Sequence, residues 1–452
     1  MTADSDTIFA LASAPGVAGV AVVRVSGPAV GSVLHRLTGL DSADVTPRRA
    51  MLRALHDGPG GELIDRALLI LFPAPGSFTG EDVLELHVHG GRAVQEALFA
   101  AIAAVEGTRM AGPGEFSRRA VANGRMDLTA AEGIADLVAA ETAQQRRLAL
   151  RQGAGELARL YDGWRTRLIG LLAHLEAWLD FPDEDLPDSL AGEVAADCTA
   201  LARELRDHLQ GARAGERIRD GLMVAIVGPP NAGKSSLLNA LARRDVAIVT
   251  DIPGTTRDVL EVHLDLDGHA VTLVDTAGLR DSDDRIEQEG IRRARLRARS
   301  ADMVLWLASP GDAGREADLT LAGDGAVVIP IRTKSDLVGQ MMTQDMVSSS
   351  DLRVSSLTGD GIPELVRRMT SEAARLTEIG AGMAPTRMRH RDSLTRCLLA
   401  LDRVASGSMD WSVPELIGEE LRRAANELGR ITGRVDVEDL LDVIFRDFCI
   451  GK

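Results

Sequence analysis

The sequence predicts an α/β domain inserted into a helical domain, with a separate α+β domain ahead of both. Residues 217–380 alternate short β-branched runs with glycine-rich loops and helical stretches, as parallel sheets do. The flanking segments, 120–216 and 381–452, show helical periodicity, whereas residues 1–119 mix strands with helices. An insertion is the simplest arrangement, because domain termini usually lie close together at the surface.

The composition is that of an ordinary globular chain. Of its 452 residues, 45% are hydrophobic and 26% charged, and the net charge is −16. This charge argues against a protein that coats nucleic acid by bulk attraction. Three widely spaced cysteines, Cys198, Cys397 and Cys449, suit neither a disulfide framework nor a C-x-x-C metal site. With no signal-peptide pattern and no apolar run of membrane-spanning length, we expect a cytoplasmic protein without a membrane partner.

The N-terminal domain is expected to combine three strands with a helix. These elements are predicted at residues 20–25, 66–72, 83–89 and 92–105. In the third, V-L-E-L-H-V-H alternates, which places Glu85, His87 and His89 on one face. Two interpretations stay open for this face: a metal site, or a solvated and hydrogen-bonded surface.

Helical periodicity governs the segments on both sides of the α/β domain. Thr129 is predicted to cap one helix, with Glu132 three residues later completing a capping box. Further helices are predicted at residues 168–179, 189–213, 386–405, 413–432 and 437–445.

The stretch G-L-M-V-A-I-V-G-P-P-N-A-G-K-S-S, residues 221–236, carries the most specific motif. Its apolar run predicts a buried strand, and a helix follows the glycine loop. Gly228, Gly233, Lys234 and Ser235 satisfy G-x-x-x-x-G-K-[ST]. Loop amides then face an anion, Lys234 reaches the β- and γ-phosphates, and the Ser235 hydroxyl binds Mg²⁺. The sequence therefore predicts a nucleoside triphosphate site.

Three further groups follow in the order that GTPases use. Thr255 or Thr256, in G-T-T-R-D, can bind Mg²⁺ and sense the γ-phosphate. Asp275, at the start of D-T-A-G, can hold Mg²⁺ through water, and the Gly278 amide can contact the γ-phosphate. Asp336, in T-K-S-D, can accept two hydrogen bonds that guanine offers and adenine lacks. Four motifs in this order predict GTP rather than ATP.

The set resembles the Ras-like, translation-factor-related GTPases and, within them, the MnmE (TrmE) family of tRNA modification GTPases. The resemblance extends over nearly the whole chain. It includes D-T-I and R-V-S-G near the start, F-T-G-E-D, H-G-G, P-G-E-F, N-G-R-M-D-L and the terminal F-C-I-G-K. The implied architecture is an N-terminal folate-binding domain at 1–119, a helical domain at 120–216 and 381–452, and an inserted Ras-like GTPase domain at 217–380.

The resemblance implies a full nucleotide site. Its members are Asn231, Ala232, Gly233, Lys234, Ser235, Ser236, Thr250, Asp251, Ile252, Pro253, Gly254, Thr255, Thr256, Asp275, Thr276, Ala277, Gly278, Thr333, Lys334, Asp336, Ser355 and Ser356. It implies Mg²⁺ on Ser235 and Thr256, and K⁺ on Asn231, Thr250, Ile252 and Thr255. Leu279 stands where Ras-like enzymes have a water-orienting Gln. The implied catalytic residues are therefore Glu287, which orients the water, with Asn231 and Lys234.

Two of the residues that are expected to lie near the guanine base depart from the family pattern. Thr333 stands where the family usually has Asn, so we expect guanine preference to survive with weaker bracing of the loop. Ser356 replaces the usual Ala, and this contact runs through a backbone amide, so the change is expected to be neutral.

The N-terminal domain is implied to bind a tetrahydrofolate, 5-formyl-tetrahydrofolate in its known form, and to form a homodimer. The matching positions are Arg24, Glu85, Arg125 and Lys452, with Arg125 where the family commonly has Lys. A carboxylate such as Glu85 suits the donor edge of a pterin. With an FAD- and NADH-dependent partner subunit, the family installs a carboxymethylaminomethyl or aminomethyl group at C5 of the wobble uridine, position 34, of certain tRNAs.

Two further features of the sequence, a cysteine near the end and a run of arginines, each have two interpretations that stay open. Cys449 is either a nucleophile beside a bound folate, for one-carbon chemistry, or a small buried residue that anchors the tail. A run of five arginines is either an RNA contact or a solvated helix face; it comprises Arg292, Arg293, Arg295, Arg297 and Arg299.

Two other functions compete with tRNA modification. A ribosome-assembly GTPase usually carries a basic RNA-binding module, which this sequence lacks. A folate-dependent one-carbon transferase with a regulatory GTPase remains an alternative from another class.

Overall fold

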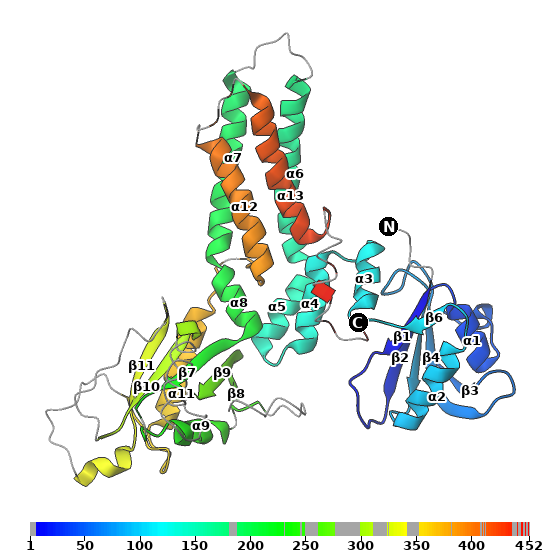
Figure 1. Ribbon diagram of the computed structural model, residues 1–452, viewed down its shortest axis with the longest axis horizontal. Helices are drawn as coiled ribbons and strands as arrows, with labels where there is room; N and C mark the ends of the chain where they lie inside the picture. Colours follow the sequence, from blue (N-terminus) through cyan, green and yellow to red (C-terminus); the bar gives the residue numbers. More distant parts are fainter. Residues whose placement is uncertain are drawn as a thin grey trace, which may run out of the picture. The chain divides into compact units, whose positions relative to one another are not determined.

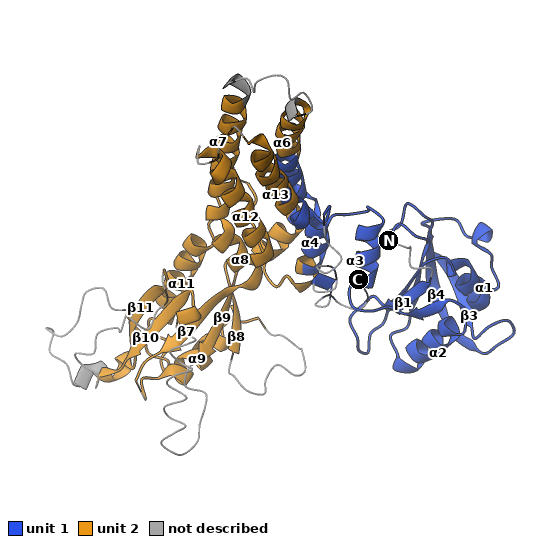
Figure 2. Cartoon of the chain, turned by 45° about the horizontal axis from the view of Figure 1, so that its top comes forward, with its two compact units in different colours: residues 1–135, 152–165, 428–452 blue, residues 136–151, 166–427 orange. Residues whose placement is uncertain are grey.

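A computed structural model gives the fold of this chain. It describes residues 6–179, 188–229, 231–244, 246–248, 261–275, 299–310, 323, 325–340, 352–380, 382–406, 409, 411, 413–435, 441, 444–445, 448 and 451. The chain divides into two compact units (Figure 2). Unit 1 comprises residues 1–135, 152–165 and 428–452, and unit 2 comprises residues 136–151 and 166–427.

Unit 1 is built on a six-stranded sheet in the order β3-β4-β5-β2-β1-β6 (Figure 1). The strands are β1 (Thr7–Leu11), β2 (Ala21–Ser26), β3 (Met51–His56), β4 (Leu63–Phe72), β5 (Val83–Val88) and β6 (Thr108–Met110). Neighbours pair antiparallel, except β1 and β6, which are parallel. The three strands predicted at residues 20–25, 66–72 and 83–89 are present, with their ends shifted by up to three residues.

Helices α1 (Val30–Thr38) and α2 (Arg92–Ala103) pack on this sheet. A short 3-10 helix, η1 (Ser42–Asp44), follows α1. Alternation along the strands sends one set of side chains to the core, with Val23, Val25, Leu84 and Leu86 fully buried. The other set includes Arg24 and Glu85, so the polar residues singled out above belong to the opposite face.

The rest of unit 1 joins α3 (Glu115–Ala122) and α4 (Leu128–Ala139) to the C-terminal tail. Phe445 and Phe448 pack with Leu128 of α4 in one apolar cluster. Gly451 lies so close to β1 that a Cβ on it would be 2.1 Å from the carbonyl oxygen of Leu11. The terminal segment therefore returns to the first strand of the chain.

The predicted cap of α4 is wrong. Asp127, and not Thr129, caps this helix, since Asp127 Oδ1 accepts hydrogen bonds from the backbone N–H groups of Thr129 (2.8 Å) and Ala130 (3.0 Å). Thr129 and Glu132 are buried residues inside the helix. A carboxylate one residue before the helix reaches the free N–H groups, whereas the Thr129 hydroxyl itself donates to Asp127.

Unit 2 contains a second six-stranded sheet in the order β12-β11-β10-β7-β9-β8. Its elements are β7 (Leu222–Val227), α9 (Lys234–Ala242), β8 (Glu261–Leu266), β9 (His269–Asp275), β10 (Met303–Ala308), β11 (Val327–Arg332), η4 (Ser335–Gln340), β12 (Leu352–Arg353) and α11 (Ile362–Leu376). All neighbouring strands are parallel except β8 and β9. The sheet and its helices enclose an aliphatic core that includes Val224, Ile226, Leu305 and Leu365.

The helical part of the chain contains long helices that lie side by side and run antiparallel (Figure 1). Its helices are α5 (Ala143–Gly153), α6 (Glu156–Leu179), α7 (Asp188–Gln210), α8 (Ala212–Asp220), α12 (Met388–Ala405) and α13 (Pro414–Thr432). In sequence, the second sheet lies between α8 and α12. The predicted fold class, with α+β, helical and inserted α/β parts, is confirmed; the residue boundaries of the four domains stay predictions. Within the described residues, none of the helices is both long and apolar enough to span a membrane.

Candidate functional site

The phosphate-loop motif lies between β7 and α9, as its sequence predicts. Gly228 directly follows the strand, and a Cβ on it would be 2.4 Å from the Leu307 carbonyl oxygen, so no larger residue fits. Asn231 (φ 61°) and Gly233 (φ 91°) both adopt left-handed backbone conformations, and Gly233 is the N-cap of α9. This loop turns back on itself immediately before a helix N-terminus, which is the geometry that presents backbone N–H groups to an anion.

Lys234 begins α9 and lies across the loop. Its Nζ donates to the carbonyl oxygens of Gly228 and Pro229, both at 2.9 Å. Ser235 and Ser236 follow in the first turn and are exposed, whereas Ala232 is buried. The ammonium group is thereby held within the loop, where a phosphate can replace the carbonyl oxygens as its partner.

Thr333 ties the predicted base-binding loop to the phosphate loop. Its hydroxyl donates to the Ala232 carbonyl oxygen at 2.7 Å, and its backbone N–H donates to Ala308 at 2.9 Å. Thr333 is 3% exposed, so this is a buried hydrogen bond. The hydroxyl therefore connects two segments 101 residues apart. The expectation that Thr braces this loop less strongly than Asn stays a prediction.

Asp336 and Ser355 meet at the edge of the same sheet. The Ser355 hydroxyl donates to Asp336 Oδ1 at 2.6 Å, and its oxygen accepts from the backbone N–H of Thr358 at 3.2 Å. Oδ2 and the second lone pair of Oδ1 then remain, so this exposed carboxylate can still accept two hydrogen bonds from a ligand. Lys334 (φ 56°) and the half-buried Ser356 complete the described part of this group. The sequence placed Ser355 in the nucleotide site, but it did not predict that the Ser355 hydroxyl supports Asp336.

The remaining predicted nucleotide residues lie outside the described part of the chain. These are Thr250, Asp251, Ile252, Pro253, Gly254, Thr255, Thr256, Thr276, Ala277, Gly278 and Glu287, with Leu279 and the arginines at 292–297. For Asp275 the structure gives its backbone as the last residue of β9.

In unit 1, Arg24 and Glu85 are directly opposite each other on β2 and β5. Arg24 Nη2 and Nε donate to Glu85 Oε1 at 2.9 and 3.1 Å, with both side chains less than a fifth exposed. The Arg24 guanidinium also lies over the rings of Phe78 and Phe116, 5.3 and 5.8 Å from their centroids. The aromatic partners were not predicted, although both phenylalanines stand in the quoted motifs F-T-G-E-D and P-G-E-F.

The two histidines near Glu85 have different surroundings. His89 lies just after β5, and its Nδ1 is 2.8 Å from Asp65 Oδ1. His87 Nε2 is buried and 3.6 Å from Glu85 Oε2. Of the two interpretations left open, the hydrogen-bonded face describes Glu85 and His89; within the described residues no cluster of three His, Cys, Asp or Glu side chains suits a metal ion.

Arg125 lies beside the loop that carries Phe78. A Cβ on Gly80, where φ is 84°, would be 3.2 Å from Arg125 Cγ, so the glycine accommodates the arginine stem. Asn123 Nδ2 donates to the Thr79 carbonyl oxygen at 2.8 Å and fixes the same loop. Arg24, through Phe78, and Arg125, beside Gly80, thus both lie against one loop, residues 77–82, and Glu85 is paired with Arg24. Lys452 and Cys449 are outside the described residues.

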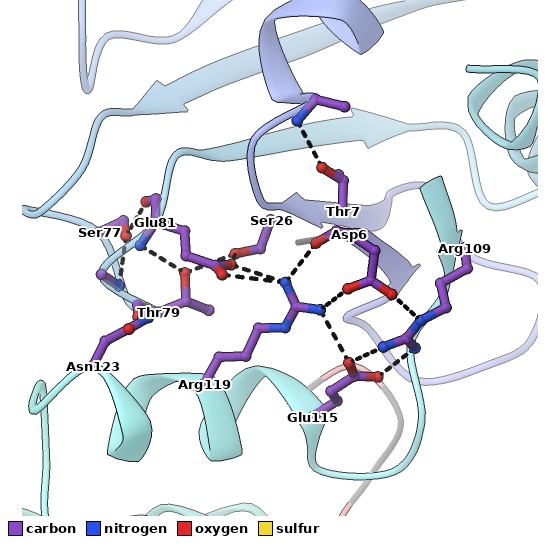
Figure 3. Close-up of polar contacts among 12 residues, drawn as sticks. Asp6, Thr7, Ser26, Ser77, Thr79, Glu81, Arg109, Glu115, Arg119 and Asn123 are labelled. Atoms are coloured by element: carbon purple, nitrogen blue, oxygen red, sulfur yellow. Dashed lines mark hydrogen bonds and ion pairs between the residues drawn. The ribbon is translucent and has the colours of Figure 1, made fainter. Parts of the chain in front are cut away.

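A buried charge network supports this loop (Figure 3). Arg119 is 5% exposed and donates to Asp6 Oδ1 (2.7 Å), Glu81 Oε1 (3.2 Å) and Glu115 Oε1 (3.2 Å). Glu81 in turn accepts from the Ser26 hydroxyl at 2.6 Å. The network joins the start of β1, the 77–82 loop and α3. None of these contacts was predicted.

Arg109 adds a second positive charge to the network. Burial opposes ionisation of Glu115, but hydrogen bonds from Arg109 and from the Gly112 backbone lower the pKa of this carboxyl overall. The pKa of Asp6 is likewise lowered, because hydrogen bonds from Arg109 and Arg119 outweigh the effect of burial. Both carboxyls are therefore held ionised at neutral pH.

The phosphate loop lies between the parallel strand β7 and α9, and the loop of Asp336 follows β11 in the same sheet. Together they define a P-loop nucleotide-binding domain. Comparisons with known proteins place it in a family. Residues 7–125 match the family model described as GTP-binding protein TrmE N-terminus, and residues 128–449 match that of the MnmE helical domain. The chain belongs to the MnmE (TrmE) family.

Full-length relatives agree with this assignment. A protein of Rhodospirillum rubrum is 52% identical over 457 residues, and the match covers 99% of each chain. Proteins of Parvibaculum lavamentivorans and Rhizobium johnstonii are 50% and 52% identical and match 99% of this chain and 100% and 99% of their own length. All three are called tRNA modification GTPase MnmE.

Proposed function

We propose that this chain is a GTP hydrolase that acts in tRNA modification. The observation that carries the proposal is the hydrogen bond from Thr333 to Ala232, which joins a phosphate loop to the loop of Asp336. A base and a triphosphate bound at these two loops would have a fixed relative position. The relatives, each called a tRNA modification GTPase, support the biological role.

The nucleotide assignment is tested by measuring GTP and ATP hydrolysis by the purified full chain at equal concentrations. We expect the chain to hydrolyse GTP and to bind it far more tightly than ATP, because Asp336 accepts two hydrogen bonds that guanine offers and adenine does not. Equal affinity for the two nucleotides would contradict the assignment.

Metal ions complete the proposed site. Mg²⁺ would be held by Ser235 and Thr256, with Asp275 acting through water, and K⁺ by Asn231, Thr250, Ile252 and Thr255. The described residues fit: Asn231 is exposed on its left-handed turn, and Ser235 is in the first turn of α9. The potassium ion would supply positive charge where other GTPases place an arginine. Glu287 is proposed to orient the attacking water, since Leu279 has no polar atom.

Replacing Glu287 with Ala is expected to leave GTP affinity intact and to lower the hydrolysis rate by about 10²- to 10⁴-fold, the usual contribution of a positioned base. Exchanging sodium for potassium at constant ionic strength should raise wild-type hydrolysis steeply. Single-turnover rates with radiolabelled GTP measure both. Normal hydrolysis by Glu287→Ala, or indifference to the cation, would rule out this mechanism while leaving GTP binding untouched.

We further propose that unit 1 binds a tetrahydrofolate through Arg24, Glu85, Arg125 and Lys452. Glu85 retains an oxygen, Oε2, that Arg24 does not use and that can accept from a pterin donor edge. Arg24 and Arg125 can pair with anionic parts of the ligand. Gly451, next to Lys452, lies against β1, which supports placing the tail at this face.

Glu85→Ala is expected to weaken binding of 5-formyl-tetrahydrofolate by about 10- to 150-fold, the cost of losing a charged hydrogen bond. Isothermal titration calorimetry measures the affinity. Glu96→Ala is the matched control, because Glu96 is exposed and forms an ion pair with Arg92, one turn earlier in α2. Unchanged affinity in Glu85→Ala would show that the folate positions are wrongly assigned.

The modification itself is proposed at family level. With an FAD- and NADH-dependent partner subunit, a homodimer of this chain would install a carboxymethylaminomethyl or aminomethyl group at C5 of uridine 34 in certain tRNAs, in the cytoplasm. Cys449 stays a candidate for one-carbon chemistry because it neighbours Lys452 in sequence. The two buried thiols are poor candidates, since burial raises the pKa of Cys198 to about 12 and also raises that of Cys397.

A further inference from the structure

The β8–β9 hairpin connects the GTPase motifs to a distant turn. The G-T-T-R-D motif ends three residues before β8, and D-T-A-G begins at Asp275, the last residue of β9. The two strands are paired from Glu261↔Val274 to Leu266↔His269. Their opposite end is the tight turn of Asp267 and Gly268, both with positive φ. Since β8 is the edge strand of the sheet and is paired with β9 along its whole length, a displacement at the motif end can reach the turn through this pairing.

His269, at this turn, is held from two sides. It is 8% exposed; its Nδ1 is 2.8 Å from Thr377 Oγ1 and its Nε2 is 3.0 Å from Gln144 Nε2. The Thr377 hydroxyl donates to Ala373, so its oxygen is available to accept from the imidazole Nδ1–H. The ring nitrogen Nε2 can then accept from the Gln144 amide, which satisfies both nitrogens of a neutral ring.

The neutral form is also the one that burial favours. Burial lowers the pKa of His269, and this outweighs the nearby charges of Asp267 and Asp265. A proton on Nε2 would direct a second donor at the Gln144 amide nitrogen. The contact is therefore a specific one between two uncharged groups.

The first turn of α5 makes further contacts at the same place. The backbone N–H of Gln144 donates to the Gly268 carbonyl oxygen at 3.3 Å. Gln145 Nε2 donates to the carbonyl oxygen of Arg219 at 3.0 Å, three residues before β7 begins. The start of α5 thus contacts both the hairpin turn and the end of α8, the helix that precedes β7 and the phosphate loop.

Asp136 binds both of the chain segments that connect the α/β part to the helical part. Asp136 Oδ1 accepts from Arg219 Nε at 3.1 Å and from Arg387 Nη2 at 2.7 Å. Arg219 precedes the second sheet and Arg387 follows it, so one carboxylate clamps both connections by ion pairs. The hairpin turn, in contrast, is attached by neutral hydrogen bonds. The junction and the turn are thus two separate points of attachment, and the turn belongs to the hairpin that adjoins the GTPase motifs.

We propose that His269 is a positioning residue that couples the GTPase motifs to α5, so that the nucleotide state changes the environment of the helical part through the β8–β9 turn. The proposal rests on the GTPase function proposed above. Since the coupling runs through His269 and Gln144, removing either side should uncouple the two parts without altering the nucleotide site itself.

The test compares His269→Ala and Gln144→Leu with His263→Ala in the full chain. His263 is the matched control, because it lies on the same hairpin and its Nδ1 contacts Thr272 of the neighbouring strand, 3.2 Å away. Hydrogen–deuterium exchange of residues 143–151 is measured with GDP and with a non-hydrolysable GTP analogue. Wobble-uridine modification is measured in a complemented deletion strain.

We expect the wild type and His263→Ala to show a nucleotide-dependent difference in exchange that His269→Ala and Gln144→Leu lose. Modification should fall by about 5- to 150-fold in both variants, the range of ordinary coupling free energies. GTP affinity and hydrolysis should stay within about twofold of wild type, as expected for a distant site.

Three outcomes would overturn the inference. In the first, the wild type shows no nucleotide-dependent difference in exchange. In the second, His269→Ala and Gln144→Leu keep both this difference and full tRNA modification. In the third, the two variants lose GTP affinity in parallel with modification, as a purely structural role predicts. Absence of GTP hydrolysis in the wild type would contradict the proposed function instead, and is recognised before the variants are compared.

Discussion

Replacing Arg119 with Gln is expected to destabilise unit 1 by about 3–5 kcal/mol, the cost of removing one partner from a buried ion pair. Arg119 is 5% exposed and serves three carboxylates, so its loss leaves Asp6, Glu81 and Glu115 with only partial compensation. Hydrogen–deuterium exchange of α3 amides with increasing urea measures the local free energy of unfolding in this two-unit chain.

A matched arginine on unit 2 provides the control. Arg367 pairs with Glu364 on α11, but its side chain is 72% exposed. Arg367→Gln should therefore cost less than about 1 kcal/mol. Equal effects of the two substitutions would mean that the Arg119 network does not support unit 1.

Because of the same network, the stability of unit 1 is expected to fall as the pH becomes acidic. The pKa values of Asp6 and Glu115 are lower in the folded chain than their ordinary values. Their contribution to stability is complete above the ordinary carboxyl range, about pH 4, and is lost as the pH falls through the lowered values. Thermal unfolding of the full chain at a series of acidic pH values should show this loss for the wild type and less of it for Arg119→Gln.

Asp336→Asn is expected to weaken GTP binding by about 2–4 kcal/mol, or roughly 30- to 1000-fold. The substitution replaces an acceptor by a donor against the donor edge of guanine. Xanthosine triphosphate, whose base has a carbonyl where guanine has an amino group, should in turn bind the variant better than the wild type. Fluorescence titration with labelled nucleotides measures the affinities.

Asp360→Asn is the control for this loop. Asp360 accepts from the Thr358 hydroxyl at 2.7 Å, next to the Ser355 turn, but has no proposed contact with the base. Its substitution should leave the choice between guanine and xanthine unchanged. If Asp336→Asn retained wild-type affinity for GTP, the assignment of the base site would fail.

The sequence predicted elements whose signal is local. The glycine loop and its flanking strand and helix follow from contiguous residues. The apolar run at residues 20–25 and the alternation at residues 83–89 located β2 and β5 within one residue of their ends. Local signals were ambiguous at α4, where Asp127 and Thr129 both suit a cap. Only the structure shows that the carboxylate reaches the free N–H groups.

Contacts between distant residues were beyond the reach of sequence patterns. Arg119 and Asp6 are 113 residues apart, and Gln144 and His269 are 125 apart. Nothing in the local pattern around His269 distinguishes it from a solvated turn residue. The hydrogen bond from the Thr333 hydroxyl to Ala232, 101 residues away, was likewise not predicted. The pairing depends on how the sheet brings strand ends together.

The central claim is that this GTPase acts on tRNA, and nucleoside analysis tests it most directly. Total tRNA from a strain that lacks the gene is digested and its wobble-uridine nucleosides are quantified by mass spectrometry, beside the parent strain and a strain complemented with the wild-type chain. We predict that carboxymethylaminomethyl- and aminomethyl-substituted uridines disappear in the deletion strain and return on complementation. Unchanged nucleosides in the deletion strain would contradict the account.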